Sequence, residues 1–127
     1  ERSFNTPIEA VEEMIETMSI SPFIMEGLRN EDEIIMMVLK EDAYIKMGDD
    51  WEKTSFPYLN MRKYTVIKAE ESALVNRYRA IEEDSIIDLW INKRDKHLQR
   101  IYFEEDDYFI DLYFSHFIEE IEEDFIF

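Results

Sequence analysis

The side chains best suited to chemistry in this sequence are acidic, and they are densest near its C-terminal end. Residues 101–127 hold ten Asp and Glu residues and no Lys or Arg, so this segment cannot neutralise its own charge. Its acids must meet basic groups elsewhere on the fold, on a partner, or only in solvent. We take all ten as candidate partner-binding residues: Glu104, Glu105, Asp106, Asp107, Asp111, Glu119, Glu120, Glu122, Glu123 and Asp124.

Two of these acidic groups also resemble cation sites. On a helix, His116 would have Glu119 and Glu120 three and four residues away and Asp111 about one turn earlier, a set that could ligate a metal. The run 104–107 could offer oxygen ligands to Ca²⁺, but it lacks the glycine-centred loop and alternating ligands of an EF-hand. Both patterns are also typical of solvated helix faces and helix starts, so we expect no metal and no cofactor.

Catalytic motifs are absent from the sequence. Two glycines and two histidines cannot supply a glycine-rich phosphate loop, a nucleophile elbow or a Ser/His/Asp order. A carboxylate pair, or an acid cluster with Lys53 or Lys93, can be assembled from almost any chain this acidic. We therefore expect no enzyme activity.

The sequence contains one basic patch. Arg77 and Arg79 fall on one face of a predicted strand, and Lys93-Arg94-Asp95-Lys96 falls in the next hairpin turn. We interpret the arginines as an intramolecular counter-surface for the acidic helices and the turn as a solvated hairpin tip. The seven methionines are interpreted mainly as core gap-fillers, with an adaptable partner groove as the alternative.

Composition limits the class of protein. The chain has 127 residues, 46% of them hydrophobic, which is enough for one domain spanning residues 1–127 with a packed core. Its net charge of −17 argues against direct binding to nucleic acid or to anionic membranes. Its longest apolar run, Ile34–Leu39, is far too short to span a bilayer. The absence of cysteine is typical of a reducing compartment, so we expect a cytoplasmic location.

Helices are predicted at both ends. Thr6-Pro7-Ile8-Glu9 forms a capping box with proline at the first helical position, and apolar spacing extends that helix to Met18. Ser21-Pro22 predicts a short second helix that ends at Gly27. Ile34–Leu39 fits a third helix slightly better than a buried strand, and periodicity does not separate the two. A C-terminal helix is predicted from Ile110, Phe114, Phe117, Ile118, Ile121 and Phe125.

Strands are predicted between the helices. Ala43–Met47 is a short strand, followed by a loop from Gly48 to about Asn60. Segments 64–67, 73–81, 85–91 and 98–103 have short connections and therefore form an antiparallel meander. Ile87, Leu89 and Ile91 should face the first helix. The predicted fold class is α+β, with N-terminal helices and a C-terminal helix packed on a curved antiparallel sheet.

Three functions fit these features. The leading hypothesis is an acidic inhibitor, such as an immunity protein, an antitoxin or a nucleic-acid mimic, that sequesters a basic toxin or nuclease. A helix over 119–124 would carry one charge per ~1.8 Å of its axis, near the value of about 1.7 Å for duplex DNA. The alternatives are a non-inhibitory adaptor or subunit of a larger assembly, and a ligand-binding or enzymatic cup lined by Trp51, Tyr78 and Trp90.

Overall fold

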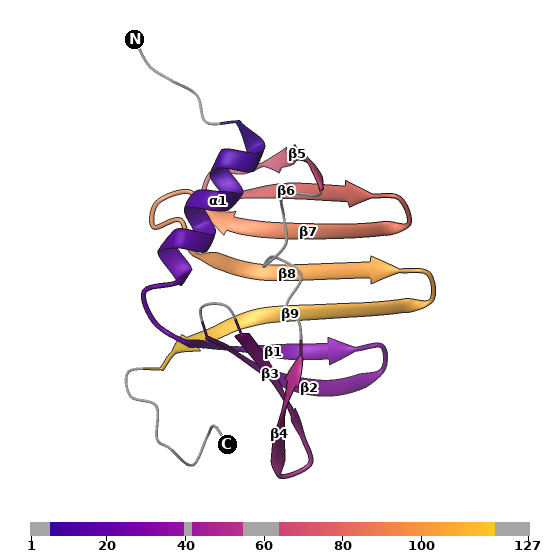
Figure 1. Cartoon of the computed structure of the whole chain (residues 1–127). Coiled ribbons are helices and arrows are strands. Elements are labelled where there is room, and N and C mark those ends of the chain that lie inside the picture. Colours follow the sequence, from indigo (N-terminus) through magenta and orange to yellow (C-terminus); the bar gives the residue numbers. More distant parts are fainter. Residues whose placement is uncertain (1–5, 40–41, 55–63, 119–127) are drawn as a thin grey trace.

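The computed structural model describes residues 6–39, 42–54 and 64–118 and is dominated by one antiparallel sheet (Figure 1). In these ranges it contains one helix, α1 (Pro7–Met18), and nine strands in the order β4-β3-β2-β1-β9-β8-β7-β6-β5. The strands are β1 (Phe23–Arg29), β2 (Asp32–Leu39), β3 (Asp42–Met47), β4 (Asp50–Thr54), β5 (Thr65–Glu71), β6 (Val75–Glu82), β7 (Ser85–Asn92), β8 (Leu98–Glu105) and β9 (Tyr108–Phe117).

The capping box predicted for the first helix is confirmed. The Thr6 hydroxyl accepts a hydrogen bond from the Glu9 backbone N–H at 3.3 Å, and the Glu9 carboxylate accepts one from the Thr6 N–H at 2.9 Å. The apolar stripe of α1 is buried through Val11, Met14 and Met18. This helix crosses one face of the sheet (Figure 1).

The predicted meander is also confirmed, and it extends further than expected. β5, β6, β7 and β8 pair in chain order, and β9 follows as the next antiparallel neighbour. Ile87, Leu89 and Ile91 are almost completely buried in one cluster with the apolar stripe of α1, as predicted. The buried methionines Met14, Met18, Met25 and Met36 belong to the same core cluster, as expected of gap-fillers.

The predicted second helix is wrong. Phe23–Arg29 is strand β1, and Ser21-Pro22 precedes this strand instead of capping a helix. Gly27 does not end a helix: it pairs with Leu112 of β9, and a Cβ at this position would collide with the backbone carbonyl of Asp111. Glycine is therefore needed here because two backbones approach closely.

The uncertain third element is a strand. Ile34–Leu39 belongs to β2, and Met36, Met37 and Val38 are all buried there, which explains why the run has no polar alternation. The predicted strand over Ala43–Met47 is confirmed as β3. The predicted loop that follows is wrong in its first part, because Gly48, with a φ of 66°, begins a tight turn that leads directly into β4.

The predicted C-terminal helix is wrong for the residues that the structure describes. Tyr108–Phe117 is strand β9, which lies between β8 and β1. Ile110 and Leu112 are buried while Tyr113 is exposed, the alternation of a strand. Residues 119–127, which carry the rest of that prediction, lie outside the described residues. Among the described residues, no helix is long and apolar enough to cross a membrane.

Candidate partner-binding surface

Three hairpin turns lie at one end of the sheet. The β1–β2 turn at 30–31, the β6–β7 turn at 83–84 and the β8–β9 turn at 106–107 are stacked along the same side in Figure 1. The strand register agrees with this arrangement, because Glu105 pairs with Ser85, next to the β6–β7 turn, and with Tyr108, next to the β8–β9 turn. The acidic residues of the turns and their flanks form what we call the acidic end: Glu31, Asp32, Glu33, Glu82, Glu83, Asp84, Glu104, Glu105, Asp106 and Asp107. One base, Arg29, also flanks these turns, opposite Asp32.

Tight local geometry fixes these turns. The first residue of each has a positive φ: 55° for Asn30, 46° for Glu83 and 55° for Asp106. Such a backbone costs an ordinary L-residue on the order of 1–2 kcal/mol, so Glu83 and Asp106 occupy positions that glycine would adopt more cheaply. Asn30 ties its turn to β9, since its N–H donates to the Phe109 carbonyl at 2.8 Å and its side-chain oxygen accepts from the Phe109 N–H at 2.9 Å.

Two of the acidic hairpins line a common hollow. Its walls come from the β6–β7 turn, from Glu105 and from Tyr64 before β5. Ser85 donates a hydrogen bond to the Glu105 carboxylate at 2.8 Å, which links the two hairpins. Within the described ranges, no group of three or more His, Cys, Asp and Glu side chains is placed to hold a metal ion.

The face of the sheet opposite α1 carries an ordered row of cationic and aromatic side chains. Arg77, Trp90, Arg100 and Tyr113 are successive cross-strand neighbours on β6, β7, β8 and β9. The Arg77 guanidinium lies 5.8 Å from the centre of the Trp90 ring, and the Arg100 guanidinium lies 4.4 Å from Trp90 and 4.8 Å from Tyr113. We call these four residues the cation–aromatic row.

Ion pairs hold the arginines in place. Asp88, only 5% exposed, accepts hydrogen bonds from Arg79 at 2.8 and 2.9 Å and from Arg77 at 3.3 Å. Arg100 binds Asp111 through two hydrogen bonds of 2.9 Å. The bonds to Asp88 raise the pKa of Arg79, and those to Asp111 raise the pKa of Arg100. The predicted arginine counter-surface therefore pairs with carboxylates on neighbouring strands instead of with acidic helices.

The predicted site residues fall into three groups. Glu104, Glu105, Asp106 and Asp107 lie together at the acidic end, on a hairpin turn instead of a helix start. Asp111 lies on the row face, where Arg100 neutralises its charge within the fold. The remaining five are outside the described residues: Glu119, Glu120, Glu122, Glu123 and Asp124.

Two acidic turns were missed by sequence reasoning. The acids at 82–84 could have been predicted to join those at 104–107, because every second turn of an antiparallel meander lies at the same end of the sheet. Residues 31–33 could not, because the prediction left β2 undecided and made β1 a helix.

The opposite end of the sheet is basic. Lys93, Arg94 and Lys96 lie in or beside the β7–β8 turn, as predicted for a hairpin tip. Lys93 donates to Glu71 at 2.8 Å, and hydrogen bonds from Lys93 and Lys68 lower the pKa of Glu71. The acidic end and this basic turn therefore lie at opposite ends of the strands, with Arg29 beside the first and with Glu71 and Asp95 beside the second.

Two other candidate sites have different geometry from the predicted one. His116 lies on a strand and shares a 2.8 Å hydrogen bond with Ser115, so the helical arrangement with Asp111 is not formed. Tyr78 is buried on the α1 side of the sheet whereas Trp90 lies on the opposite side, so these two residues do not line one cup.

Comparison with known proteins identifies no family for the chain. No protein-family model matches it. A search of curated proteins finds no significant relative. The function must therefore be argued from the acidic end and the cation–aromatic row.

Proposed function

We propose that this protein is a non-catalytic binding protein whose acidic end captures a basic protein partner, in the manner of an immunity protein, an antitoxin or a nucleic-acid mimic. One observation carries the proposal: three hairpins gather ten carboxylates at one end of the sheet, where Arg29 is the one base that flanks their turns. The partner in this proposal is a toxin, a nuclease or another protein that binds nucleic acid.

The density of charge supports this reading. The three hairpins occupy six adjacent strands, β6, β7, β8, β9, β1 and β2, so at about 4.8 Å per strand the acidic end is ~24 Å wide. Ten carboxylates over that width are enough to attract a basic surface at long range and to raise the association rate by roughly 10–10³-fold at low salt.

The face that carries the cation–aromatic row adds aromatic and apolar contacts to the charge of the acidic end. Tyr113 is 50% exposed and Leu28 is 39% exposed, and both lie on the side of the sheet opposite α1. Tyrosine, tryptophan and arginine are enriched among the residues that dominate binding energy in protein interfaces. A basic partner steered to the acidic end therefore has an aromatic surface beside it on which to dock.

Mimicry of nucleic acid is the narrower version of the proposal. The helix predicted over 119–124 lies outside the described residues, so this version depends on the acidic end. Direct binding to nucleic acid or membranes is not part of the proposal, because the net charge is −17. A cytoplasmic location is part of it, because the chain has no cysteine.

The test compares two variants with the same net charge. The acidic-end variant carries Glu31→Gln, Glu83→Gln, Asp84→Asn and Asp107→Asn. The control variant carries Glu16→Gln, Asp49→Asn, Asp50→Asn and Glu52→Gln, four exposed acids outside the acidic end. These eight side chains make no hydrogen bond or ion pair within the described part of the chain, so both variants should fold.

The partner is isolated from the native host with the parent protein and identified by mass spectrometry, and its own activity is then assayed. We expect a basic protein whose activity is inhibited by the parent and the control variant but much less by the acidic-end variant. Binding without inhibition would favour an adaptor or subunit instead. Equal inhibition by both variants would contradict the role of the acidic end, and metal-dependent hydrolysis by the purified protein would contradict a non-catalytic function.

A further inference from the structure

The cation–aromatic row is incomplete at its β1 end. Cations and aromatic rings alternate along the row, in the order Arg77, Trp90, Arg100 and Tyr113. The Arg100 guanidinium lies between the two aromatic rings. Beyond Tyr113, the next position in the row belongs to Glu26 of β1, which pairs directly with Tyr113. A carboxylate therefore stands where the alternation calls for another cation.

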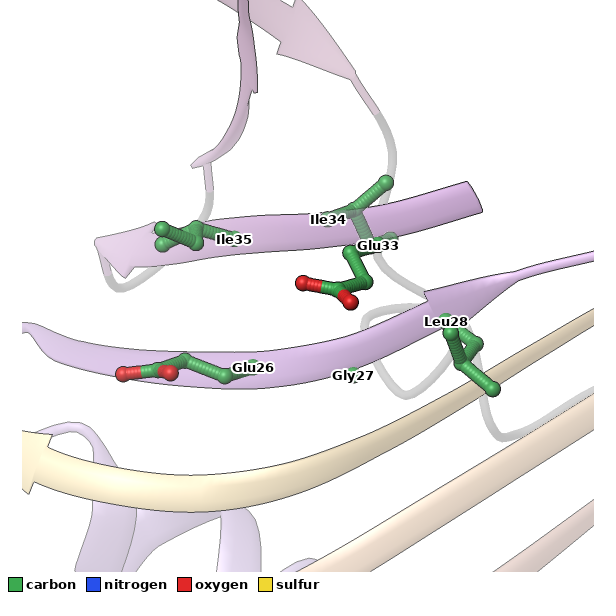
Figure 2. A pocket seen from close by; sticks show the side chains of 6 residues that line it. All are labelled: Glu26, Gly27, Leu28, Glu33, Ile34 and Ile35. Carbon is green, nitrogen blue, oxygen red and sulfur yellow. The ribbon is translucent and has the colours of Figure 1, made fainter. Parts of the chain in front are cut away.

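A hollow lies at this position. It is lined by the strand segments 26–28 and 33–35 of the β1–β2 hairpin (Figure 2) and has a volume of about 530 Å³. Figure 2 shows the Glu33 carboxylate extending from β2 toward β1, and the Glu26 side chain lying along β1. Leu28 and Ile35 provide apolar surface beside the two carboxylates.

The described residues supply no counter-charge for either carboxylate. Glu26 and Glu33 are exposed, and neither makes an ion pair or a hydrogen bond with any described residue. They differ in this from Asp88 and Asp111 on the same face, which are bound by the row's arginines and by Arg79. Two exposed carboxylates without a described partner, beside a half-exposed tyrosine, are complementary to one cation of the size of a side chain.

We propose that this hollow, which we call the arginine slot, receives an arginine side chain of the basic partner. The proposal rests on the proposed function, and it names the contact that would fix the partner's position. The guanidinium would lie against Tyr113 and donate to Glu26 and Glu33, and the arginine stem would pack on Leu28 and Ile35. Glu33 also belongs to the acidic end, so the slot continues the surface that attracts the partner.

Arginine fits this site better than lysine. A guanidinium is flat, stacks on aromatic rings and has five N–H donors, so it can stack on Tyr113 and bind two carboxylates together. It would also continue the pattern already present, in which the Arg100 guanidinium lies over two aromatic rings while it binds Asp111.

The slot can be tested without the partner. N-acetyl-arginine-N′-methylamide is titrated into the ¹⁵N-labelled protein at low ionic strength, with the uncharged citrulline analogue as a control ligand. We expect saturable shifts of the backbone amides of Glu26, Leu28, Glu33 and Tyr113 with the arginine probe and none with the citrulline probe. Shifts spread evenly over the acidic end would mean general ion attraction and would overturn the slot.

Variants then separate charge from stacking. Glu26→Gln with Glu33→Gln should weaken binding of the arginine probe at least tenfold, and Tyr113→Leu should weaken it several-fold. The matched control, Glu16→Gln with Glu52→Gln, removes the same charge and should change the affinity less than twofold. Equal weakening by the two double variants, or tighter binding of the lysine analogue, would overturn the proposal.

Failure of the arginine slot and failure of the proposed function give different results. If the partner depends on the acidic end but binds the Glu26→Gln/Glu33→Gln variant as tightly as the parent, the slot is refuted and the function stands. If the arginine probe binds the slot but the identified partner ignores the acidic end, the proposed function is refuted. If size-exclusion chromatography shows a dimer that this variant dissociates, the occupant is a second copy of this chain and the slot for a partner is overturned.

Discussion

Asp88→Asn tests whether the ion pairs on the row face hold this part of the sheet together. Asp88 is 5% exposed and accepts three hydrogen bonds from Arg77 and Arg79, at 2.8, 2.9 and 3.3 Å. Asparagine has the same shape but only one acceptor oxygen and no charge, so at least one arginine contact is lost and the others weaken.

The magnitude follows from the burial of the partners. Breaking a fully buried ion pair costs about 3–5 kcal/mol, but the Arg77 and Arg79 side chains are 23% and 38% exposed, so water can replace part of the lost contacts. We therefore expect a loss of about 2–3 kcal/mol in the free energy of unfolding. With an unfolding entropy of ~2.1 cal/mol/K per residue over the whole chain, the melting temperature should fall by about 7–11 °C.

Urea unfolding, followed by circular dichroism and by tryptophan fluorescence, measures this loss. Asp107→Asn is the matched control, because it makes the same chemical change at an exposed position in the β8–β9 turn. Removing one charge from the acidic end should leave stability within about 0.5 kcal/mol or raise it slightly, since like charges repel there. If Asp88→Asn behaves like Asp107→Asn, the network does not stabilise the sheet and our account of this face is wrong.

Three further changes test the core, the close approach of β1 and β9, and the titration of the row face. Leu89→Ala should lower the free energy of unfolding by about 2–5 kcal/mol, and a near-neutral result would place Leu89 outside the core. Gly27→Ala should cost at least about 1–3 kcal/mol, because its Cβ would collide with the Asp111 carbonyl; unchanged urea stability would refute that contact. Tyr102 donates a hydrogen bond to Glu104, which raises the pKa of this phenol above its ordinary value of 10.0. The contribution of this bond to stability is therefore present below pH 10.0 and is lost as the pH rises through the raised pKa. Tyrosine ¹³C NMR should show this resonance titrating later than in Glu104→Gln, and identical titration would contradict the bond.

The parts of the fold that follow from local chemistry could be predicted from the sequence. The capping box at Thr6 specifies its helix through contacts only three residues apart. β5 to β8 contain β-branched and aromatic residues and are joined by short polar turns, so their pairing is also encoded locally.

The parts that were predicted wrongly depend on pairing between distant segments. β1 and β9 pair through Phe23 and Phe117, which are separated by most of the chain. Both strands contain apolar and aromatic residues that also match helical spacing, as Ile110 and Phe114 do, so periodicity alone could not choose. Both segments form strands because each pairs with a neighbour on either side, β1 with β2 and β9, and β9 with β1 and β8, and buries its apolar side chains there.

The candidate site could be predicted only in part for the same reason. The acidic turn at 104–107 is visible as a run of like charge. To predict that this turn lies beside the turns at 31–33 and 82–84, the strand order of the whole sheet must be known. The cation–aromatic row requires register as well, because Arg77, Trp90, Arg100 and Tyr113 lie on four different strands and meet only when the strands are aligned.

The most direct test of the acidic end as a capture surface is the association rate constant with the identified partner. It is measured by stopped flow at low and at high salt for the parent, the acidic-end variant and the control variant. Steering by exposed charges is screened by salt, so the parent's rate should fall at least tenfold between about 20 mM and 500 mM salt. The acidic-end variant should start about tenfold slower and respond weakly to salt, while the control variant should follow the parent. Equal rates and equal salt dependence for the two variants would contradict the claim that the acidic end captures the partner.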